Sequence, residues 1–328
     1  MNAAIGSFGY RLTLMPVALV CSAVCAQEKP ADYPQRPLRI IIAVAPGGGA
    51  DFIARATAQL LSDRWGHNAV VDSRPGGAGV VAVELLHRAS PDGHTMMQYG
   101  DGMMLIRAQK RVAFDVFKAF DPVVSSTTQP YALLVHPSLP AKSIKELIAL
   151  SASKPITYSG GGGVGGSVHV GVERLGPMAN LKLKYVPYKG ASPSILALMG
   201  GEIQMVCASA MASSAAIRTG KVRGLATTGA KRISSLPDLP TVAEQGVPGY
   251  TLTNRYNLWI PAGTPRAITA AINRLVTEGM NSPQMVERLA LEGTEPAERM
   301  TPQELRATLA REYEEIERSV IALGQKQR

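Results

Sequence analysis

Residues 39–61, RIIIAVAPGGGADFIARATAQLL, form the stretch from which the fold can be predicted. A continuous apolar run from Ile40 to Ala45 breaks at Pro46, passes through three consecutive glycines and then resumes with helical spacing. A β-branched run of this kind is typical of a strand that is covered on both faces, as in a parallel sheet. The order of strand, glycine loop and helix therefore predicts an α/β fold.

The glycine loop leaves backbone amides uncovered at the start of the predicted helix. Pro46 forces a turn, and Gly47, Gly48 and Gly49 carry no side chain that would shield the backbone. Unpaired amides and the positive end of the helix dipole converge at such a position, which can seat a carboxylate or a phosphate. The alternative is a tight turn in which Asp51 caps the helix, and one loop alone does not decide between the two.

A second stretch repeats this pattern in the middle of the chain. The predicted strand at residues 156–159 runs into GGGGVGG, residues 160–166, and a helical segment follows. Two such loops favour anion binding over a simple turn. The same glycines match G-x-G-x-x-G, but no acidic residue follows the next strand, at residues 185–189, to hold a ribose. This absence argues against a dinucleotide cofactor, and we expect no cofactor.

Composition excludes several other classes of protein. The chain has 328 residues, of which 46% are hydrophobic and 18% charged, which suits two globular domains. Its net charge is +9, but the basic residues are scattered and lack interleaved aromatic residues, so we expect no nucleic-acid partner. The five histidines show neither H-x-x-x-H spacing nor cysteine partners, so we expect no metal site.

Residues 1–26 are predicted to be a signal peptide. Arg11 supplies a positive charge, Leu12 to Val20 form an apolar stretch too short to span a bilayer, and cleavage is expected after Ala26. We therefore expect export to the periplasm. A lipid-anchored Cys21 or Cys25 is the alternative. After cleavage Cys207 is the one remaining cysteine, so no intrachain disulfide is expected.

The alternation of strands and helices predicts two lobes, each a mostly parallel sheet flanked by helices. Ligands of such sheets bind beyond the carboxyl ends of the strands. We expect crossovers near residues 127–132 and 225–229. Lobe 1 would then comprise residues 27–128 and 229–328, and lobe 2 residues 129–228.

Five segments in order along the chain resemble the Bug family of periplasmic solute-binding proteins, the receptors of tripartite tricarboxylate transporters. They are PQRPLRIIIAVAPGGGADFIAR (34–55), VVDSRPGGAGVVAVELLHRASPDGHTM (70–96), GGGGVGGSVH (160–169), VPYKGASPSILALMGGEIQM (186–205) and LPDLPTVAEQGVPGY (236–250). The resemblance implies a type II periplasmic binding-protein architecture with two crossovers. It also implies a small carboxylate in the cleft between the lobes and membrane transporter subunits as partners.

The resemblance also implies a set of ligand-binding residues, and recognition of the carboxylate by backbone amides and bridging waters. The first-lobe loop contributes Pro46, Gly47, Gly48, Gly49 and Asp51, and the second-lobe loop Ser159, Gly160, Gly161, Gly162, Gly163, Ser167 and His169, with Tyr188 from VPYKG. We add Gly100, Ser209 and Tyr256 as further candidates. No catalytic residue is expected.

One departure from the family pattern bears on the ligand. Members often carry a phenylalanine–aspartate pair where this chain has Cys207 and Ala208. Because alanine cannot pair with an ammonium group, we expect a carboxylate without one, either a di- or tricarboxylate or an aromatic acid. Two alternatives stay open: a secreted enzyme acting on a carboxylated substrate, and a ligand-sensing co-receptor without a transport role.

Overall fold

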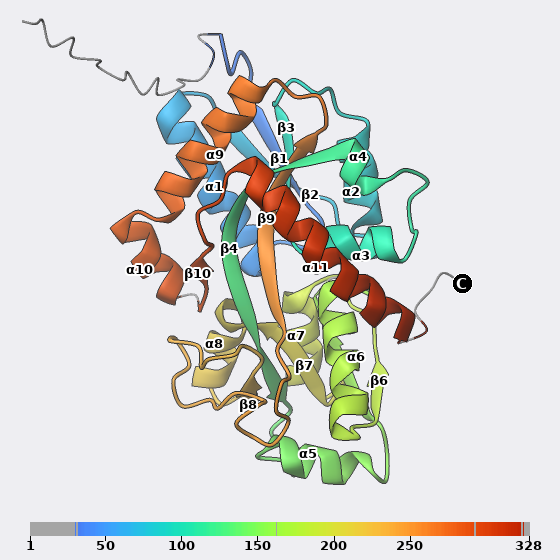
Figure 1. Ribbon diagram of the computed structural model, residues 1–328. Helices are drawn as coiled ribbons and strands as arrows, with labels where there is room; N and C mark the ends of the chain where they lie inside the picture. The colour runs from blue at the N-terminus through green and yellow to red at the C-terminus, as the bar shows by residue number, and fades with distance from the viewer. Residues whose placement is uncertain (1–29, 31, 162, 292, 323, 325–328) are drawn as a thin grey trace, which may run out of the picture.

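The computed structural model, drawn in Figure 1, describes residues 30, 32–161, 163–291, 293–322 and 324. Within these ranges ten strands form one curled sheet of order β2-β1-β3-β9-β4-β7-β5-β6, and β8 and β10 each pair with β4. Helices cover the sheet in two lobes, which confirms the predicted fold class. In the same ranges, no helix is both long and apolar enough to cross a membrane.

Lobe 1 is built on the parallel strands β1 (Leu38–Ile42), β2 (Ala69–Ser73) and β3 (Thr95–Tyr99). Beyond β3 lie the antiparallel β9 (Thr253–Pro261), the first part of β4 (Phe120–Val135) and the short β10 (Glu295–Pro296). The helices of lobe 1 are α1 (Gly49–Trp65), the 3₁₀ turn η1 (Gly77–Gly79), α2 (Val80–His87), α3 (Gly102–Ala108), α4 (Val116–Ala119), α9 (Arg266–Met280), α10 (Pro283–Leu291) and α11 (Pro302–Ala322).

Lobe 2 repeats this arrangement. Its parallel strands are β5 (Ile156–Gly160), β6 (Leu183–Tyr185) and β7 (Met205–Ser209), followed by the antiparallel second part of β4 and then β8 (Arg223–Thr227). The helices are α5 (Ile144–Ser151), α6 (Ser167–Ala179), α7 (Ala191–Met199) and α8 (Ala210–Arg218). In both lobes the first parallel strand, β1 or β5, therefore lies between the other two. An antiparallel strand that connects the lobes, β9 in lobe 1 and β4 in lobe 2, pairs with the third parallel strand.

The core confirms that the first strand is covered on both faces. Ile40 and Ile42 pack with α1 and α9, whereas Ile41 faces the other way and packs with α2, α3 and α11. All three isoleucines are completely buried. This alternation follows from the two-residue period of a strand, and the resulting layers are visible on the two sides of β1 in Figure 1.

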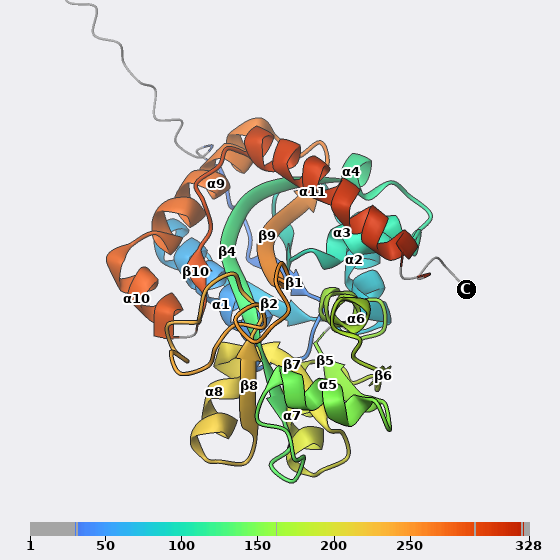
Figure 2. The same ribbon diagram turned by 60° about the horizontal axis from the view of Figure 1, so that its bottom comes forward.

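Two strands carry the chain between the lobes, and Figure 2 shows them side by side. The long β4 pairs with β9 as far as Pro130 and with β7 from Tyr131 onward, so the first crossing lies inside the predicted range. The return crossing lies at Leu252 and Thr253, where β9 begins, rather than near residues 225–229.

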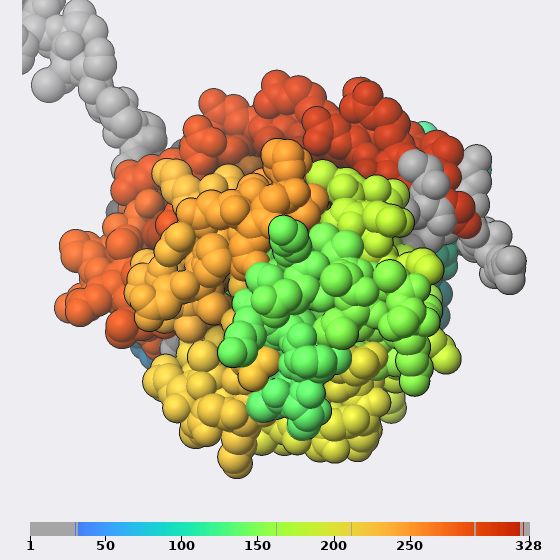
Figure 3. Space-filling model, turned by 90° about the horizontal axis from the view of Figure 1, so that it is seen from below, coloured from blue at the N-terminus to red at the C-terminus, as the bar shows by residue number. Residues whose placement is uncertain are grey.

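The segment between Gly229 and Leu252 belongs to lobe 2 because its apolar side chains complete the core of that lobe. Val242, Val247, Tyr250 and Leu252 share one buried cluster with Leu225. Backbone contacts agree, since the Leu252 amide donates to the Thr228 carbonyl (2.7 Å). Figure 3, which views the molecule from lobe 2, shows this segment in orange against the green surface around α5.

Candidate ligand-binding cleft between the lobes

A pocket lies between the two lobes. Its walls come from the loops that follow β1, β3, β5 and β7, together with the crossing strands β4 and β9. These loops meet because the carboxyl ends of the parallel strands in both lobes point toward the interlobe edge. Of the predicted site residues, those that line the pocket are Gly48, Gly49, Gly100, Gly161, Ser167, Ser209 and Tyr256.

Five helices begin at the wall of this pocket. Gly49, Gly102, Ser167 and Ala191 are the first residues of α1, α3, α6 and α7, and Ser209 is the N-cap of α8. Each helix start concentrates unpaired amides and the positive end of a dipole equivalent to roughly half a charge. The helix dipoles therefore favour an anion in the pocket without any cationic side chain.

Glycine N-caps keep these amides available for a bound molecule. α1, α6 and α7 follow Gly48, Gly166 and Gly190, and none of these three N-caps makes a side-chain hydrogen bond to its helix. Serine or aspartate at an N-cap would satisfy these donors internally. The free amides of these helices must find acceptors in water or in a ligand.

No side chain with a formal charge is present among the described residues that line the pocket. A bound anion would therefore be neutralised by peptide dipoles rather than by an ion pair. In the described part of the chain there is also no group of three or more His, Cys, Asp or Glu residues arranged to hold a metal ion.

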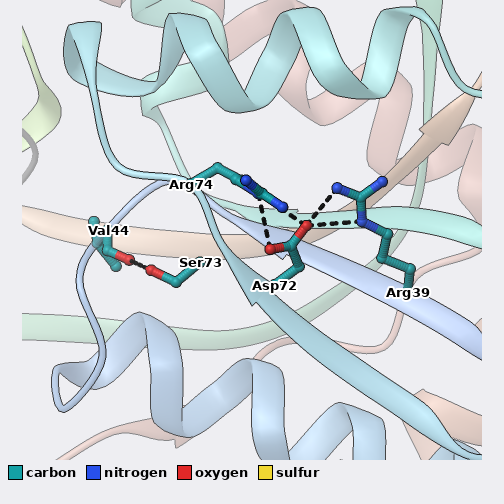
Figure 4. Close-up of polar contacts among 5 residues, drawn as sticks. All are labelled: Arg39, Val44, Asp72, Ser73 and Arg74. Atoms are coloured by element: carbon teal, nitrogen blue, oxygen red, sulfur yellow. Dashed lines mark hydrogen bonds and ion pairs between the residues drawn. The ribbon is translucent and has the colours of Figure 1, made fainter.

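The first glycine loop is anchored from both of its sides. Asp51 accepts hydrogen bonds through Oδ2 from the Gly47 amide (3.1 Å) and from Arg55 Nε (3.0 Å). On the β2 side, the Ser73 hydroxyl donates to the Val44 carbonyl, next to the cluster in which Asp72 pairs with Arg39 and Arg74 (Figure 4).

Pro46, Gly47 and Asp51 are three further predicted site residues of the first loop. The structure places all three outside the pocket lining. The Gly47 amide is already occupied by the Asp51 carboxylate, and a carboxylate does not attract an anion. Asp51 instead shapes the loop that presents Gly48 and Gly49.

The second glycine loop also divides between lining and support. Gly160 is required by packing, because a Cβ there would lie 2.4 Å from a Val168 methyl and 2.9 Å from the Cys207 carbonyl. Ser159 is buried and its hydroxyl meets that of Ser194 at 3.2 Å, which ties β5 to α7. Both residues thus lie behind the pocket rather than in its lining.

Three more predicted residues of lobe 2 lie outside the lining. His169 accepts a hydrogen bond from the Gly165 amide through Nδ1 (2.8 Å), and burial lowers its pKa to about 4, so the ring is neutral. A Cβ on Gly163 would lie 3.9 Å from the amide nitrogen of Ala78 in lobe 1. The Tyr188 hydroxyl donates to Glu202 (2.8 Å). Gly162 lies outside the described residues.

Comparison with known proteins identifies the family. The family model described as "Tripartite tricarboxylate transporter family receptor" matches residues 53–323. The chain belongs to this receptor family. It is 31% identical, over 89% of its length and 88% of the relative's, to "UPF0065 protein in tcbD-tcbE intergenic region" of Pseudomonas sp. (strain P51).

Solved structures of receptor proteins share the fold. "R. palustris Rpa4515 with adipate" has a TM-score of 0.83 and 30% identity, covering 89% of this chain and 99% of that one. "Structure of periplasmic binding protein BugD" has a TM-score of 0.84 and 26% identity, with coverage of 90% and 100%. MatC from Rhodopseudomonas palustris "with bound malate" has a TM-score of 0.81 and 25% identity, covering 88% of this chain and 100% of that one. The predicted resemblance to the Bug family is confirmed.

In this member of the receptor family, sequence reasoning missed several residues that line the pocket. Gln98, Tyr99, Tyr131 and Asn254 line the pocket from the ends of β3 and from the crossing strands. Tyr131 and Asn254 both hydrogen-bond to the Tyr256 hydroxyl, and burial raises the pKa of both tyrosines. The single polar residue inside the apolar strand TMMQY was a usable signal for Gln98, whereas nothing local distinguished Tyr131.

Asp101 stands directly between two lining glycines of the receptor but faces a separate polar hollow. Its amide donates to Asn254 Oδ1 (3.0 Å). Burial raises the pKa of its carboxyl to about 7, and nearby Glu312 adds to this effect while Arg255 opposes it. Arg255 is itself paired with Glu312 (3.1 Å). The carboxyl group therefore titrates near neutral pH in the folded protein.

Replacing Asp101 by asparagine is expected to change how the receptor's stability depends on pH. The Asp101 carboxyl has a pKa of about 7 in the folded state, above the ordinary value of 3.8. As pH rises, this group therefore loses its proton at a lower pH in the unfolded state than in the folded state. The free energy of unfolding therefore falls as pH rises between these two values. The Tm of Asp101→Asn relative to the wild type should rise from pH 5 to pH 8. The exposed Asp63→Asn variant serves as control; an Asp101→Asn difference that stays constant with pH would contradict the assignment.

Proposed function

We propose that this chain is an extracytoplasmic receptor that captures a small organic carboxylate in the interlobe cleft and delivers it to the membrane subunits of a tripartite tricarboxylate-type transporter. The observation that supports the proposal is the convergence of uncapped helix starts on a pocket without charged side chains. Such a site favours an anion with several acceptor oxygens. Family membership supports the transport role and the periplasmic location.

The chemistry of the pocket also supports a ligand without an ammonium group. Ala208 lines the pocket with 1% of its surface exposed, and no lining carboxylate among the described residues is available to pair with a cation. Much of the remaining wall is apolar, with Ala43, Val44 and Val168 among its residues. A dicarboxylate with a short aliphatic body, or an aromatic acid, matches this combination. Two proteins of the same fold, Rpa4515 and MatC, have been solved with adipate and with malate.

An enzymatic role receives little support from the same residues. Ser167 and Ser209 line the pocket, but no described histidine or carboxylate lines it to act as their base. The Cys207 thiol is fully buried and burial raises its pKa, which opposes a nucleophilic role.

A melting screen tests the proposal directly. The protein, prepared without residues 1–26, is heated with adipate, malate, citrate, benzoate, glutamate or aspartate, and the change in Tm is measured. We expect the largest increase with an acid that lacks an ammonium group, and no product by mass spectrometry. Tightest binding of glutamate or aspartate would contradict the ligand class, and turnover would contradict the receptor role.

Substitution of Gly48 should weaken binding strongly without unfolding the protein. Gly48 has an extended backbone (φ −108°, ψ 176°), and a Cβ there would meet nothing closer than Ala191 at 3.9 Å, so valine is compatible with the fold. Its methyl groups would cover the amides of α1. We expect Gly48→Val to lose two charged hydrogen bonds, about 3 kcal/mol or roughly a hundredfold in Kd.

Calorimetry with the acid that stabilises best in the screen measures this loss. Gly48→Ala is the graded control and should retain more affinity, because one methyl group leaves part of the amide surface open. An unchanged Kd in Gly48→Val would remove the first glycine loop from the site.

A charge introduced at Ala208 should oppose binding of an acid. In Ala208→Asp a carboxylate would stand in the pocket wall, and its repulsion of the bound anion should weaken binding at least about tenfold. Ala208→Asn has nearly the same size and no charge, so it separates crowding from electrostatics. Calorimetric titration of both variants checks the prediction, and equal losses in the two would argue against an electrostatic cause.

A further inference from the structure

Hydrogen bonds join the two lobes across the mouth of the cleft. Gln109 Nε2 donates to the Gly165 carbonyl (3.0 Å), and Arg111 Nη1 donates to the Val164 carbonyl (3.1 Å). Both donors follow α3 in lobe 1, and both acceptors belong to the second glycine loop of lobe 2. Neither Gln109 nor Arg111 lines the pocket. These contacts therefore connect the lobes without touching a molecule in the cleft.

The side chain of Gln109 is buried between the two lobes. Its side chain is 5% exposed, and a Cβ on Gly165 would lie 2.8 Å from its carboxamide oxygen. Gly165 also has a positive φ of 76°, a conformation that favours glycine. Next to it, Leu105, Ala108 and Val320 of lobe 1 pack with Val170 of α6. The carboxamide is thus desolvated by the closed arrangement of the lobes.

The peptide at Gly165 is held from both lobes at once. Its amide donates to His169 Nδ1 within lobe 2, and its carbonyl accepts from Gln109 of lobe 1. The first contact persists whichever way the lobes are placed, because both residues belong to one loop and helix. The second exists only when the lobes are together. Separation of the lobes would expose the Gln109 carboxamide and the Gly165 carbonyl to water.

We infer that Gln109 is a positioning residue for closure: its hydrogen bond to Gly165 holds the cleft shut and slows the departure of a bound acid that it does not touch. The slower departure of the acid rests on the proposed receptor function, whereas the effect of Gln109 on closure does not. One buried hydrogen bond of this kind should change the closed-to-open ratio about two- to tenfold. Arg111 makes its contact at an exposed site, where the same donor competes with water, so its effect should be smaller.

Closure can be measured by the distance between two spin labels. Lys118→Cys in lobe 1 and Lys154→Cys in lobe 2 place labels at exposed positions, and Cys207 is buried and does not compete for the label. Distance distributions are recorded without additive and with adipate, malate or benzoate. The variants are Gln109→Ala, Gln109→Glu, which keeps the shape but removes the donor, and Arg111→Ala. Gln59→Ala, an exposed glutamine of α1, is the matched control.

We expect Gln109→Ala and Gln109→Glu to lower the closed-to-open ratio about two- to tenfold, Arg111→Ala to lower it less, and Gln59→Ala to leave it unchanged. Dissociation of an acid that binds, followed by stopped-flow fluorescence, should quicken by the same factor. Distributions of Gln109→Ala that superimpose on the wild type under every condition would overturn the inference. If none of the three acids alters the wild type, the proposed ligand class is at fault, and the additive-free distributions still decide the role of Gln109.

Discussion

The structure depends on where it leaves backbone amides without partners. Glycine N-caps at Gly48, Gly166 and Gly190 leave the first turns of α1, α6 and α7 uncapped, and these turns meet at one pocket. Unpaired donors in a partly buried site carry a free-energy cost that an anion with several oxygens relieves. The same arrangement explains why the pocket needs no lysine or arginine. Recognition by dipoles also avoids the large desolvation cost of burying a cationic side chain.

The duplication of one strand order in two lobes brings these helix starts together. The loops after β1 and β3 in lobe 1 face those after β5 and β7 in lobe 2, and β4 and β9 connect the two lobes. Asp51 and His169 do not line the pocket. Each accepts a hydrogen bond from the amide of a glycine loop and so supports the loop that does. Binding and closure are thereby linked, because the loops that line the pocket also carry the contacts between the lobes.

Local pattern was sufficient for the elements and for the family, but it did not separate lining residues from supporting ones. The glycine loops were found because strand, glycines and helix follow one another in the chain. Asp51, His169 and Tyr188 carry polar groups near those loops, yet their groups are already paired with Gly47, Gly165 and Glu202. The later return crossing was missed for a similar reason: the packing of Val242 and Tyr250 against lobe 2 leaves no periodic signal.

The sequence by itself determined the strand–glycine–helix units, the uncapped helix starts and the absence of an aspartate at Ala208, because each depends on neighbouring residues or on residue identity. Only the tertiary structure decided which of those units face one another. It brought Tyr131 to Tyr256, and Gln109 to Gly165, across long separations in the chain. Such contacts arise from the pairing of distant strands and the placement of one lobe on the other, and side-chain spacing within a segment carries no information about either.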